Sequence, residues 1–218
     1  MDEQITEKNI DRNSFVEWNK KWDDRYKSGW VRNKGKYRLL RRLFPKIALK
    51  KAPRKSYYTG VAKLAEGRFC DLGCGMGAVA GIYALLSGEK SFGIDQSHIA
   101  MKYAMKEASY FNVTCAFSAA NIYHTGIKSN SFETVYLGQV LEHLDDEMGA
   151  LNEALRILLP GGKFILSVPK EGRIPDPDHV REYTDTSLRD LLAMLPVNEV
   201  TFHDIDPRRL VVSCRVMK

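Results

Sequence analysis

The feature that most constrains the fold is the stretch 68–77, which reads RFCDLGCGMG. A short apolar run ends there in Asp71, three alternating glycines follow, and residues 78–86 continue as an apolar, helix-like run. A strand, a glycine turn and a helix in succession let the backbone approach a bound ligand closely, because glycine has no Cβ in the way. The glycines are weak evidence by themselves, so the prediction of a nucleoside-binding turn depends on other stretches of the chain.

The chain beyond the turn alternates segments with strand-like and helix-like patterns. Expected strands cover residues 69–72, 91–94, 113–118, 131–137 and 163–168, and expected helices cover 57–66, 78–86, 97–111, 146–158 and 187–194. This alternation predicts an α/β fold with a mainly parallel sheet and helices on both faces. Residues 199–204 and 210–216 are two further strand-like runs with a short connection, which predicts an antiparallel hairpin at the sheet edge.

The length of 218 residues favours one domain with an N-terminal extension over two domains. We place the extension at 1–55 and the main domain at 56–218, with a linker at 52–56. Aromatic residues recur at helical spacing over 14–26, and an apolar stripe lies among basic residues over 36–51. We interpret the extension as a helical cap, and its basic part as a lid over a substrate cleft or a contact to an anionic surface.

Charge and composition narrow the class of protein. The formal net charge is +6, and lysines and arginines crowd residues 20–68, which makes a nucleic acid or an anionic membrane surface a candidate partner. No apolar run approaches the roughly 20 residues that span a bilayer, and the first residues lack a signal-peptide pattern, so we expect a cytoplasmic protein. Four scattered cysteines do not predict disulfides. Cys70 and Cys74 flank the glycine turn, where packing is a better interpretation than a zinc site.

Five stretches in order carry a specific family resemblance. They are DLGCGMG at 71–77, FGID at 92–95, SFE at 131–133, VLEHL at 140–144 and LLPGG at 158–162. Together they resemble the class I S-adenosylmethionine-dependent methyltransferases over about residues 57–195. The resemblance implies a Rossmann-like, seven-stranded sheet, S-adenosylmethionine as the methyl donor and S-adenosylhomocysteine as the product.

A physical contrast supports this donor over a dinucleotide. Dinucleotide-binding turns have the pattern Gly-x-Gly-x-x-Gly with a pyrophosphate at the helix N-terminus. Here the third glycine comes one residue early, and Asp71 stands two residues before the first. A carboxylate in this place would repel a pyrophosphate, whereas it suits a ligand that carries a sulfonium and an ammonium group.

The resemblance also assigns the donor site. It implies that Asp71 faces the amino-acid part of the donor, that Asp95 accepts hydrogen bonds from the ribose hydroxyls, and that Gln96 flanks the adenine. Asn121 stands where the family usually has an Asp that accepts from the adenine amine; its carbonyl can accept the same bond, and a turn residue without a ligand is the alternative. The full expected donor set is Asp71, Gly73, Cys74, Gly75, Gly77, Asp95, Gln96, Asn121, Ile122 and Gly138.

Candidate catalytic residues are Glu142 and His143 after the fourth expected strand and His179 after the fifth. Methyl transfer is an in-line displacement, so the protein must align the acceptor and remove its proton, and His143 is the expected pocket residue or proton acceptor. One helical turn would bring Gln139 together with Glu142 and His143.

This part of the sequence also resembles ubiquinone-biosynthesis O-methyltransferases and the methyltransferases of small-RNA 3′ ends, which hold a divalent ion with Glu-x-x-Glu-His and a later His. Gln139 replaces the first of those ligands, so we expect no metal and keep a divalent ion as an alternative.

The sequence therefore predicts an enzyme that transfers a methyl group from S-adenosylmethionine to a small-molecule acceptor, with oxygen as the favoured atom. One alternative is a methyltransferase that acts on RNA or another polyanion, which the basic segment supports. Another is a non-catalytic S-adenosylmethionine-binding protein, which the departures at Asn121 and Gln139 permit.

Overall fold

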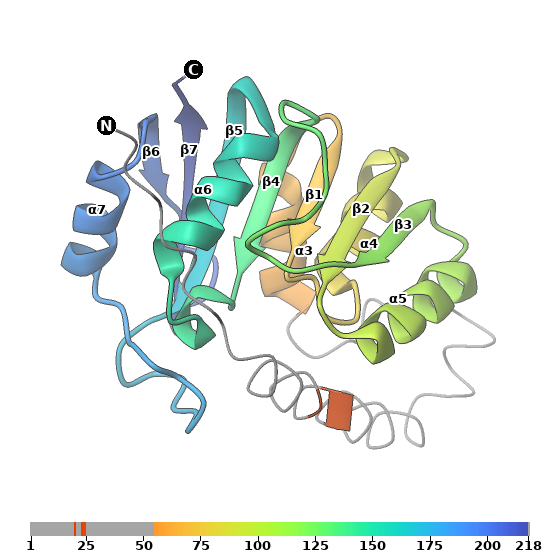
Figure 1. Ribbon diagram of the computed structural model, residues 1–218, viewed down its shortest axis with the longest axis horizontal. Helices are drawn as coiled ribbons and strands as arrows, with labels where there is room; N and C mark the ends of the chain where they lie inside the picture. The colour runs from red at the N-terminus through yellow and green to blue at the C-terminus, as the bar shows by residue number, and fades with distance from the viewer. Residues whose placement is uncertain (1–19, 21–22, 25–54, 218) are drawn as a thin grey trace, which may run out of the picture.

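The computed structural model describes residues Lys20, Asp23, Asp24 and 55–217. A seven-stranded sheet runs through this part of the chain in the order β3-β2-β1-β4-β5-β7-β6 (Figure 1). In chain order the elements are α3 (Lys55–Leu64), β1 (Phe69–Leu72), α4 (Ala78–Ser87), β2 (Ser91–Asp95), α5 (His98–Phe111), β3 (Cys115–Ala119), β4 (Phe132–Gly138), the 3₁₀ helix η1 (Leu141–His143), α6 (Glu147–Ile157), β5 (Leu158–Pro169), α7 (Asp185–Ala193), β6 (Val197–Phe202) and β7 (Arg209–Val216).

The sheet is mainly parallel, as the sequence predicts. Strands β1 to β5 pair in parallel, and β7 pairs antiparallel with both β5 and β6. The predicted antiparallel hairpin is confirmed, with β6 at one edge of the sheet and β7 inside the sheet, between β6 and β5. Successive strands are added outward from β1 in one direction as far as β3, and the chain then returns to place β4 on the other side of β1. In open α/β sheets, ligands bind at the carboxyl ends of the strands beside such a switch point.

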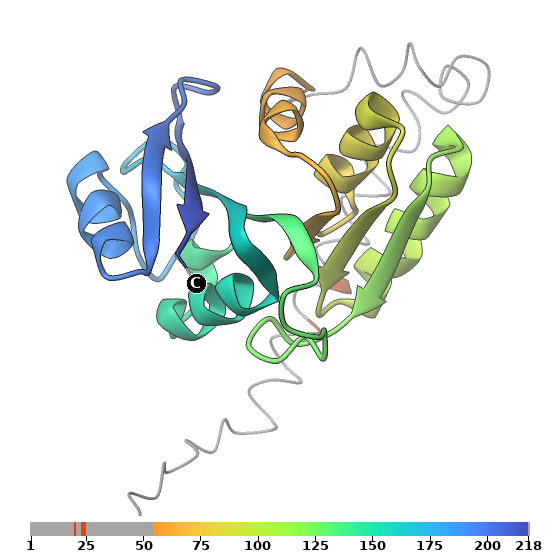
Figure 2. The same ribbon diagram turned by 90° about the horizontal axis from the view of Figure 1, so that it is seen from above.

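Helices cover both faces of the sheet, so the side chains of its central strands β1 and β4 are mostly buried (Figure 2). Along β4 successive side chains point to opposite faces. Tyr136 packs with α3 and α4, whereas Val135 and Leu137 pack with α6 and α7. Helix α5 packs against β3 through Ala100, Met101 and Ala104, with Phe117 beneath them.

Two boundaries differ from the sequence-based expectation. Helix α3 begins at Lys55, so the predicted linker at 52–56 is wrong at its end, and residues 52–54 lie outside the described part. The turn at 159–162 lies within β5 rather than before it. Leu158 already pairs with Phe132, and the ladder resumes after a register shift, with Lys163 opposite Thr134.

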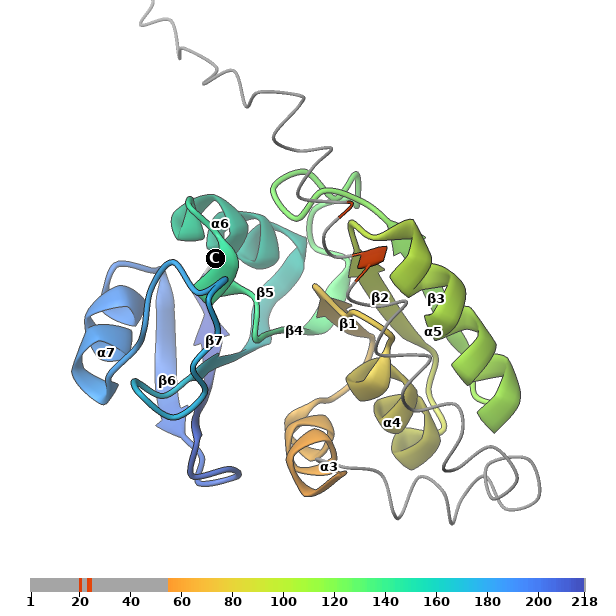
Figure 3. The same cartoon turned by 90° about the horizontal axis from the view of Figure 1, so that it is seen from below.

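Before α3, the structure describes the N-terminal extension at three residues, and the predicted division at residue 55 stays a prediction. Lys20, Asp23 and Asp24 are helical, as the expected helix over 14–26 requires; the rest of that helix and the basic segment 36–51 lie outside the described residues. The Asp23 carboxylate accepts a hydrogen bond from Ser97 Oγ, which places it at the N-terminus of α5 (Figure 3).

No helix among the described residues is long and apolar enough to cross a bilayer. All four cysteines are described, and none forms a disulfide.

Candidate active site

The glycine turn after β1 forms one wall of a cleft at the carboxyl ends of the strands. The backbone N–H groups of Gly73 and Cys74 both donate to the Ile94 carbonyl, at 2.7 and 2.8 Å, which ties the turn to the end of β2. Gly77, directly before α4, has φ +74°, a left-handed conformation that side chains with a Cβ rarely adopt. A Cβ added there would also approach the Phe117 ring to 2.6 Å. The turn therefore requires glycine for both its conformation and its close packing.

Replacing Gly77 by alanine should lower the free energy of unfolding by about 1–3 kcal/mol, because it combines a left-handed alanine with a steric clash. The measurement is chemical denaturation with circular dichroism. Gly81 is the matched control, since it lies inside α4, and a Cβ added there meets nothing within 4 Å. Gly81→Ala should raise stability by roughly 0.5–1 kcal/mol through helix propensity. Equal effects of the two changes would contradict this account of the turn.

Asp71 lies below the turn rather than in the open cleft, with an exposed fraction of 3%. Burial raises the pKa of its carboxyl to about 7; the Ala80 backbone N–H hydrogen bond opposes this shift and the Asp95 carboxylate adds to it. Its expected contact with the amino-acid part of the donor stays a prediction, and from this position the side chain would act through the turn or a water molecule.

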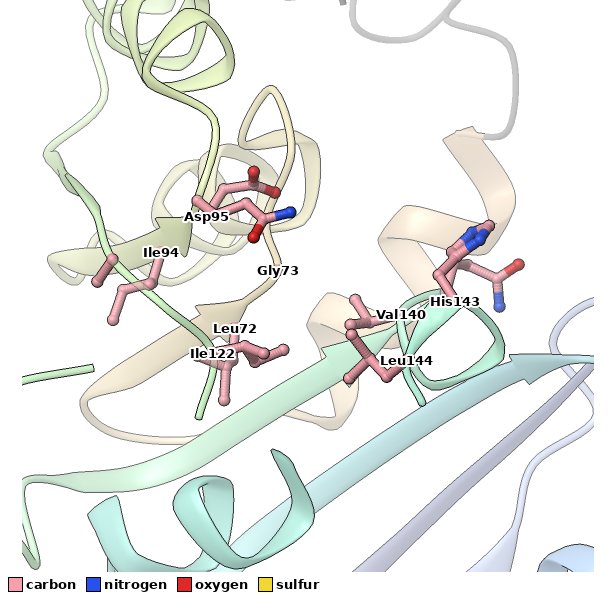
Figure 4. Close-up of a pocket in the computed structure, with 11 residues that line it drawn as sticks. Leu72, Gly73, Ile94, Asp95, Ile122, Val140, His143 and Leu144 are labelled. Carbon is pink, nitrogen blue, oxygen red and sulfur yellow. The ribbon is translucent and has the colours of Figure 1, made fainter. Parts of the chain in front are cut away.

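Asp95 ends β2 and is held by backbone donors on both oxygens. Gly75 N–H donates to Oδ2 and Ser97 N–H to Oδ1, each at 2.9 Å. A carboxylate offers about four lone-pair sites, so this anchored group can still accept hydrogen bonds from a ligand. The same side chain thus fixes the glycine turn and presents a charge to the cleft (Figure 4).

The cleft has apolar walls with polar groups at its ends, and the space between its atoms, part of it open to solvent, amounts to about 560 Å³. Its lining residues are Leu72, Gly73, Ile94, Asp95, Gln96, Ala120, Ile122, Gln139, Val140, His143 and Leu144. The sequence identified Gly73, Asp95, Gln96, Ile122, Gln139 and His143 among them. It missed the other apolar residues of the walls, because a single Leu, Ile, Ala or Val beside a motif carries no signal beyond that of core packing.

The other expected donor residues lie next to the cleft. Asn121 uses its side-chain oxygen within its own loop, where it accepts the Tyr123 N–H at 2.9 Å, and it forms an isolated bridge with His124. This is the geometry of a turn residue, although the oxygen keeps a second lone pair. Cys74, Gly75 and Gly77 belong to the turn, and Gly138 ends β4. Their contacts with a donor stay predictions.

The far end of the cleft brings together Glu142, His143 and His179, the three predicted catalytic residues. Metal-ligating atoms of these side chains all lie within 4.8 Å of one another. His143 Nδ1 is 3.0 Å from the Asp178 carbonyl, and the two imidazole rings are 4.8 Å apart, edge to face. Asp178 and His179 come from the loop after β5, so tertiary packing alone joins them to η1.

Gln139 does not lie in the helical turn that the sequence predicts. Helix η1 begins only at Leu141, and Gln139 has φ +59°. Its side chain turns toward β5 and β7, where Nε2 donates to Ser167 Oγ at 3.3 Å and Oε1 accepts from Arg209 Nε at 3.1 Å. The expectation that one turn gathers Gln139 with Glu142 and His143 is therefore wrong. Nothing in the local sequence pointed to Arg209, which is 70 residues away.

Glu142 is a buried carboxyl group, 1% exposed, and its Oε2 has no hydrogen-bond partner among the described residues. Burial raises its pKa to about 8; a backbone hydrogen bond and the charge of Arg209 oppose this shift, and Asp176 adds to it. A group of this kind is neutral near pH 7 and becomes charged in mildly alkaline solution.

Glu142→Gln should make the stability of the protein less dependent on pH between about pH 4.5 and pH 8. The pKa of Glu142 is about 8 in the folded protein and about 4.5 in the unfolded chain. As the pH rises from 4.5, Glu142 ionises in the unfolded chain first, and the free energy of unfolding falls until the folded protein ionises as well. The amide removes a penalty of as much as about 5 kcal/mol above pH 8, since the pKa difference is about 3.5 units and one unit corresponds to about 1.4 kcal/mol. Melting temperatures between pH 5 and 9 would measure it. Glu182→Gln, at an exposed site, should keep the wild-type profile; parallel profiles for Glu142→Gln and wild type would contradict the prediction.

The sheet order, the glycine turn after β1 and the carboxylate after β2 define the Rossmann-like methyltransferase class of folds. Residues 70–166 match the family model described as a methyltransferase domain. Over these residues, which make up less than half of its length, the chain is therefore similar to known methyltransferase domains.

Known proteins agree with this assignment. The uncharacterized methyltransferase YcgJ of Bacillus subtilis is 26% identical over 163 residues, covering 68% of this chain and 63% of that protein. The ubiquinone biosynthesis O-methyltransferase of Xanthomonas oryzae is 29% identical over 115 residues, covering 52% of this chain and 48% of that protein. The chain thus spans less than two thirds of the length of these relatives. The crystal structure of a SAM-dependent methyltransferase from Aquifex aeolicus superposes with a TM-score of 0.62 at 18% identity, covering 87% of this chain and 98% of that chain, which shows a shared fold.

Proposed function

We propose that the chain binds S-adenosylmethionine in the cleft and transfers its methyl group to an oxygen atom of a small-molecule acceptor. One observation carries the proposal: an anchored carboxylate at Asp95 and an imidazole at His143 line the same apolar cleft. The first is the group that a ribose requires, and the second can take a proton from an acceptor hydroxyl.

The donor end of the cleft fits the proposed ligand. Gly77 has the conformation and the tight surroundings that exclude a side chain, as a turn that approaches a ligand with its backbone requires. Asp95 would accept the ribose hydroxyls, and Gln96, Asn121 and Ile122 would surround the adenine. The bound donor supplies a methyl group already activated by its sulfonium, so the protein has to align the acceptor with it.

The acceptor end supplies proton acceptors. The Asp178 carbonyl can only accept a hydrogen bond, so the 3.0 Å contact assigns the proton to His143 Nδ1 and leaves Nε2 as the basic nitrogen. Glu142 and His179 lie beside it. We assign His143 as the base for an acceptor hydroxyl, with His179 and Glu142 contributing to the same pocket. The similarity to an O-methyltransferase supports oxygen as the methylated atom.

A macromolecular acceptor is the second candidate, because lysines and arginines crowd residues 20–68. Binding to RNA would weaken steeply as the salt concentration rises, since each neutralised phosphate releases counterions. Turnover of a neutral phenol that is insensitive to salt would oppose this candidate.

Mass spectrometry of the purified protein tests the donor directly. We expect co-purified S-adenosylmethionine or S-adenosylhomocysteine under native conditions and their loss on denaturation. A second step supplies isotopically labelled donor with a panel of phenols and with RNA, and follows the labelled methyl group. Absence of any donor binding would overturn the proposal. Donor binding without transfer to any component of a cell extract would favour a non-catalytic binding protein.

A further inference from the structure

Arg209 is a buried cation behind the acceptor end of the cleft. It begins β7 and is 5% exposed. Its Nε donates to Gln139 Oε1 at 3.1 Å, its Nη1 pairs with the Asp206 carboxylate, and its guanidinium lies 4.6 Å from the centre of the Tyr57 ring. Three different parts of the chain thus hold one positive charge in place.

The Gln139 amide is fixed by the same network. Its nitrogen donates to Ser167 Oγ at 3.3 Å, and Ser167 Oγ is in turn 2.8 Å from the Tyr57 hydroxyl. The backbone N–H of Gln139 donates to the Ser167 carbonyl at 2.8 Å, and its φ of +59° is a conformation that a non-glycine residue adopts only under constraint. The amide oxygen is therefore turned toward Arg209.

The charge near Arg209 is incompletely neutralised. Asp206 pairs with both Arg208 and Arg209, so one carboxylate faces two guanidinium groups. Burial opposes ionisation of Asp206, but hydrogen bonds and the charges of these arginines lower its pKa to about 2. The carboxylate is therefore fully ionised, and its single negative charge faces two positive charges.

These contacts bear on the divalent ion that the metal-assisted branches of the superfamily hold. Three of the side chains that such an ion would need are close together here, namely Glu142, His143 and His179. The fourth position holds Gln139, an uncharged residue whose oxygen is already bonded to a guanidinium. An ion would meet a neutral amide and a fixed positive charge where those branches supply a carboxylate, so the residues present do not fit it.

We propose that Arg209 is a positioning residue of the acceptor site that holds the Gln139 amide and excludes a divalent cation, so that the site works without a metal. This inference depends on the proposed function in one respect, namely that the residues around His143 form the acceptor site. The guanidinium supplies a permanent positive charge from the protein itself, and it cannot be removed by chelators.

Titration with Mn²⁺, followed by electron paramagnetic resonance, tests the proposal without an acceptor. The wild-type chain should leave Mn²⁺ unbound at Mn²⁺ concentrations of about 0.1 mM. This concentration is roughly the upper limit of the dissociation constants expected for specific divalent-cation sites. Arg209→Gln removes the charge while its amide can still bond to Asp206, and Mn²⁺ affinity should rise at least tenfold. Arg209→Lys keeps the charge and should behave like wild type.

Arg208→Gln is the matched control. Arg208 pairs with the same carboxylate but its side chain is 53% exposed, and its hydrogen bonds are to Asp206 rather than to Gln139. This variant should gain no Mn²⁺ binding. The gain in Arg209→Gln should disappear when His179→Ala is added, which would place the ion at the predicted side chains.

Two results would overturn the proposal. One is Mn²⁺ binding by the wild-type chain that His179→Ala abolishes, because the three side chains would then suffice. The other is a folded Arg209→Gln variant that still does not bind Mn²⁺, because Arg209 would then not be what excludes the ion. If Arg209→Gln does not fold, Arg209→Gln combined with Asp206→Asn removes both members of the buried pair and takes its place. Isothermal titration with S-adenosylmethionine on the same samples tests the proposed function separately.

Discussion

Asp95→Ala is expected to weaken binding of S-adenosylmethionine by about 1–3 kcal/mol, or roughly 5- to 150-fold, the scale for losing hydrogen bonds to a charged group. The upper end is favoured because the carboxylate also holds the Gly75 and Ser97 N–H groups, so its removal frees the glycine turn as well. Isothermal titration with the donor measures the change.

Two further variants separate the contributions. Asp95→Asn keeps one carbonyl oxygen for a backbone donor but loses the charge, so its affinity should fall between those of wild type and Asp95→Ala. Asp204→Ala, at an exposed site before β7, should leave donor affinity unchanged. Wild-type affinity in Asp95→Ala would show that the ribose lies elsewhere in the molecule.

The sequence predicted those parts of the molecule that depend on local pattern. Buried apolar runs and helical periodicity located the elements, and the glycines after Asp71 predicted the turn, because left-handed backbone conformations such as that of Gly77 restrict residue type strongly. Asp95 was predicted from the family resemblance, and the sheet gives the physical reason for its place: the carboxyl ends of adjacent parallel strands meet at one edge, so an acid that ends β2 lies beside the turn that follows β1.

The acceptor end depends on contacts that no local pattern carries. The spacing predicts Gln139 in one helical turn with Glu142 and His143, but hydrogen bonds to Ser167 and Arg209 direct its side chain away from that turn. The insertion of β7 between β5 and β6 is what brings Arg209 there. His179 was predicted from a resemblance, and its approach to His143 depends on a loop whose path is set by tertiary hydrogen bonds, such as that of Val180 N–H to the Glu142 carbonyl at 2.8 Å.

His143→Ala should lower kcat by 10²- to 10⁴-fold, the range for losing a general base, while the affinity for S-adenosylmethionine stays within about twofold. The reason is geometric: His143 lies at the acceptor end of the cleft, and its Nδ1 contact with the Asp178 carbonyl leaves Nε2 to take the proton. The measurement is single-turnover transfer of labelled methyl to the acceptor found in the screen, together with donor titration.

His203→Ala is the matched control for this change. The imidazole of His203 bonds to Ser213 Oγ at 2.8 Å, next to β6 and away from the residues that line the cleft, so its loss should leave kcat unchanged. His179→Ala should lower kcat less than His143→Ala does, because His179 reaches the base only through a ring-to-ring contact. A His143→Ala variant that binds the donor and retains full kcat would show that the acceptor loses its proton to solvent or to Glu142, and the base would have to be reassigned.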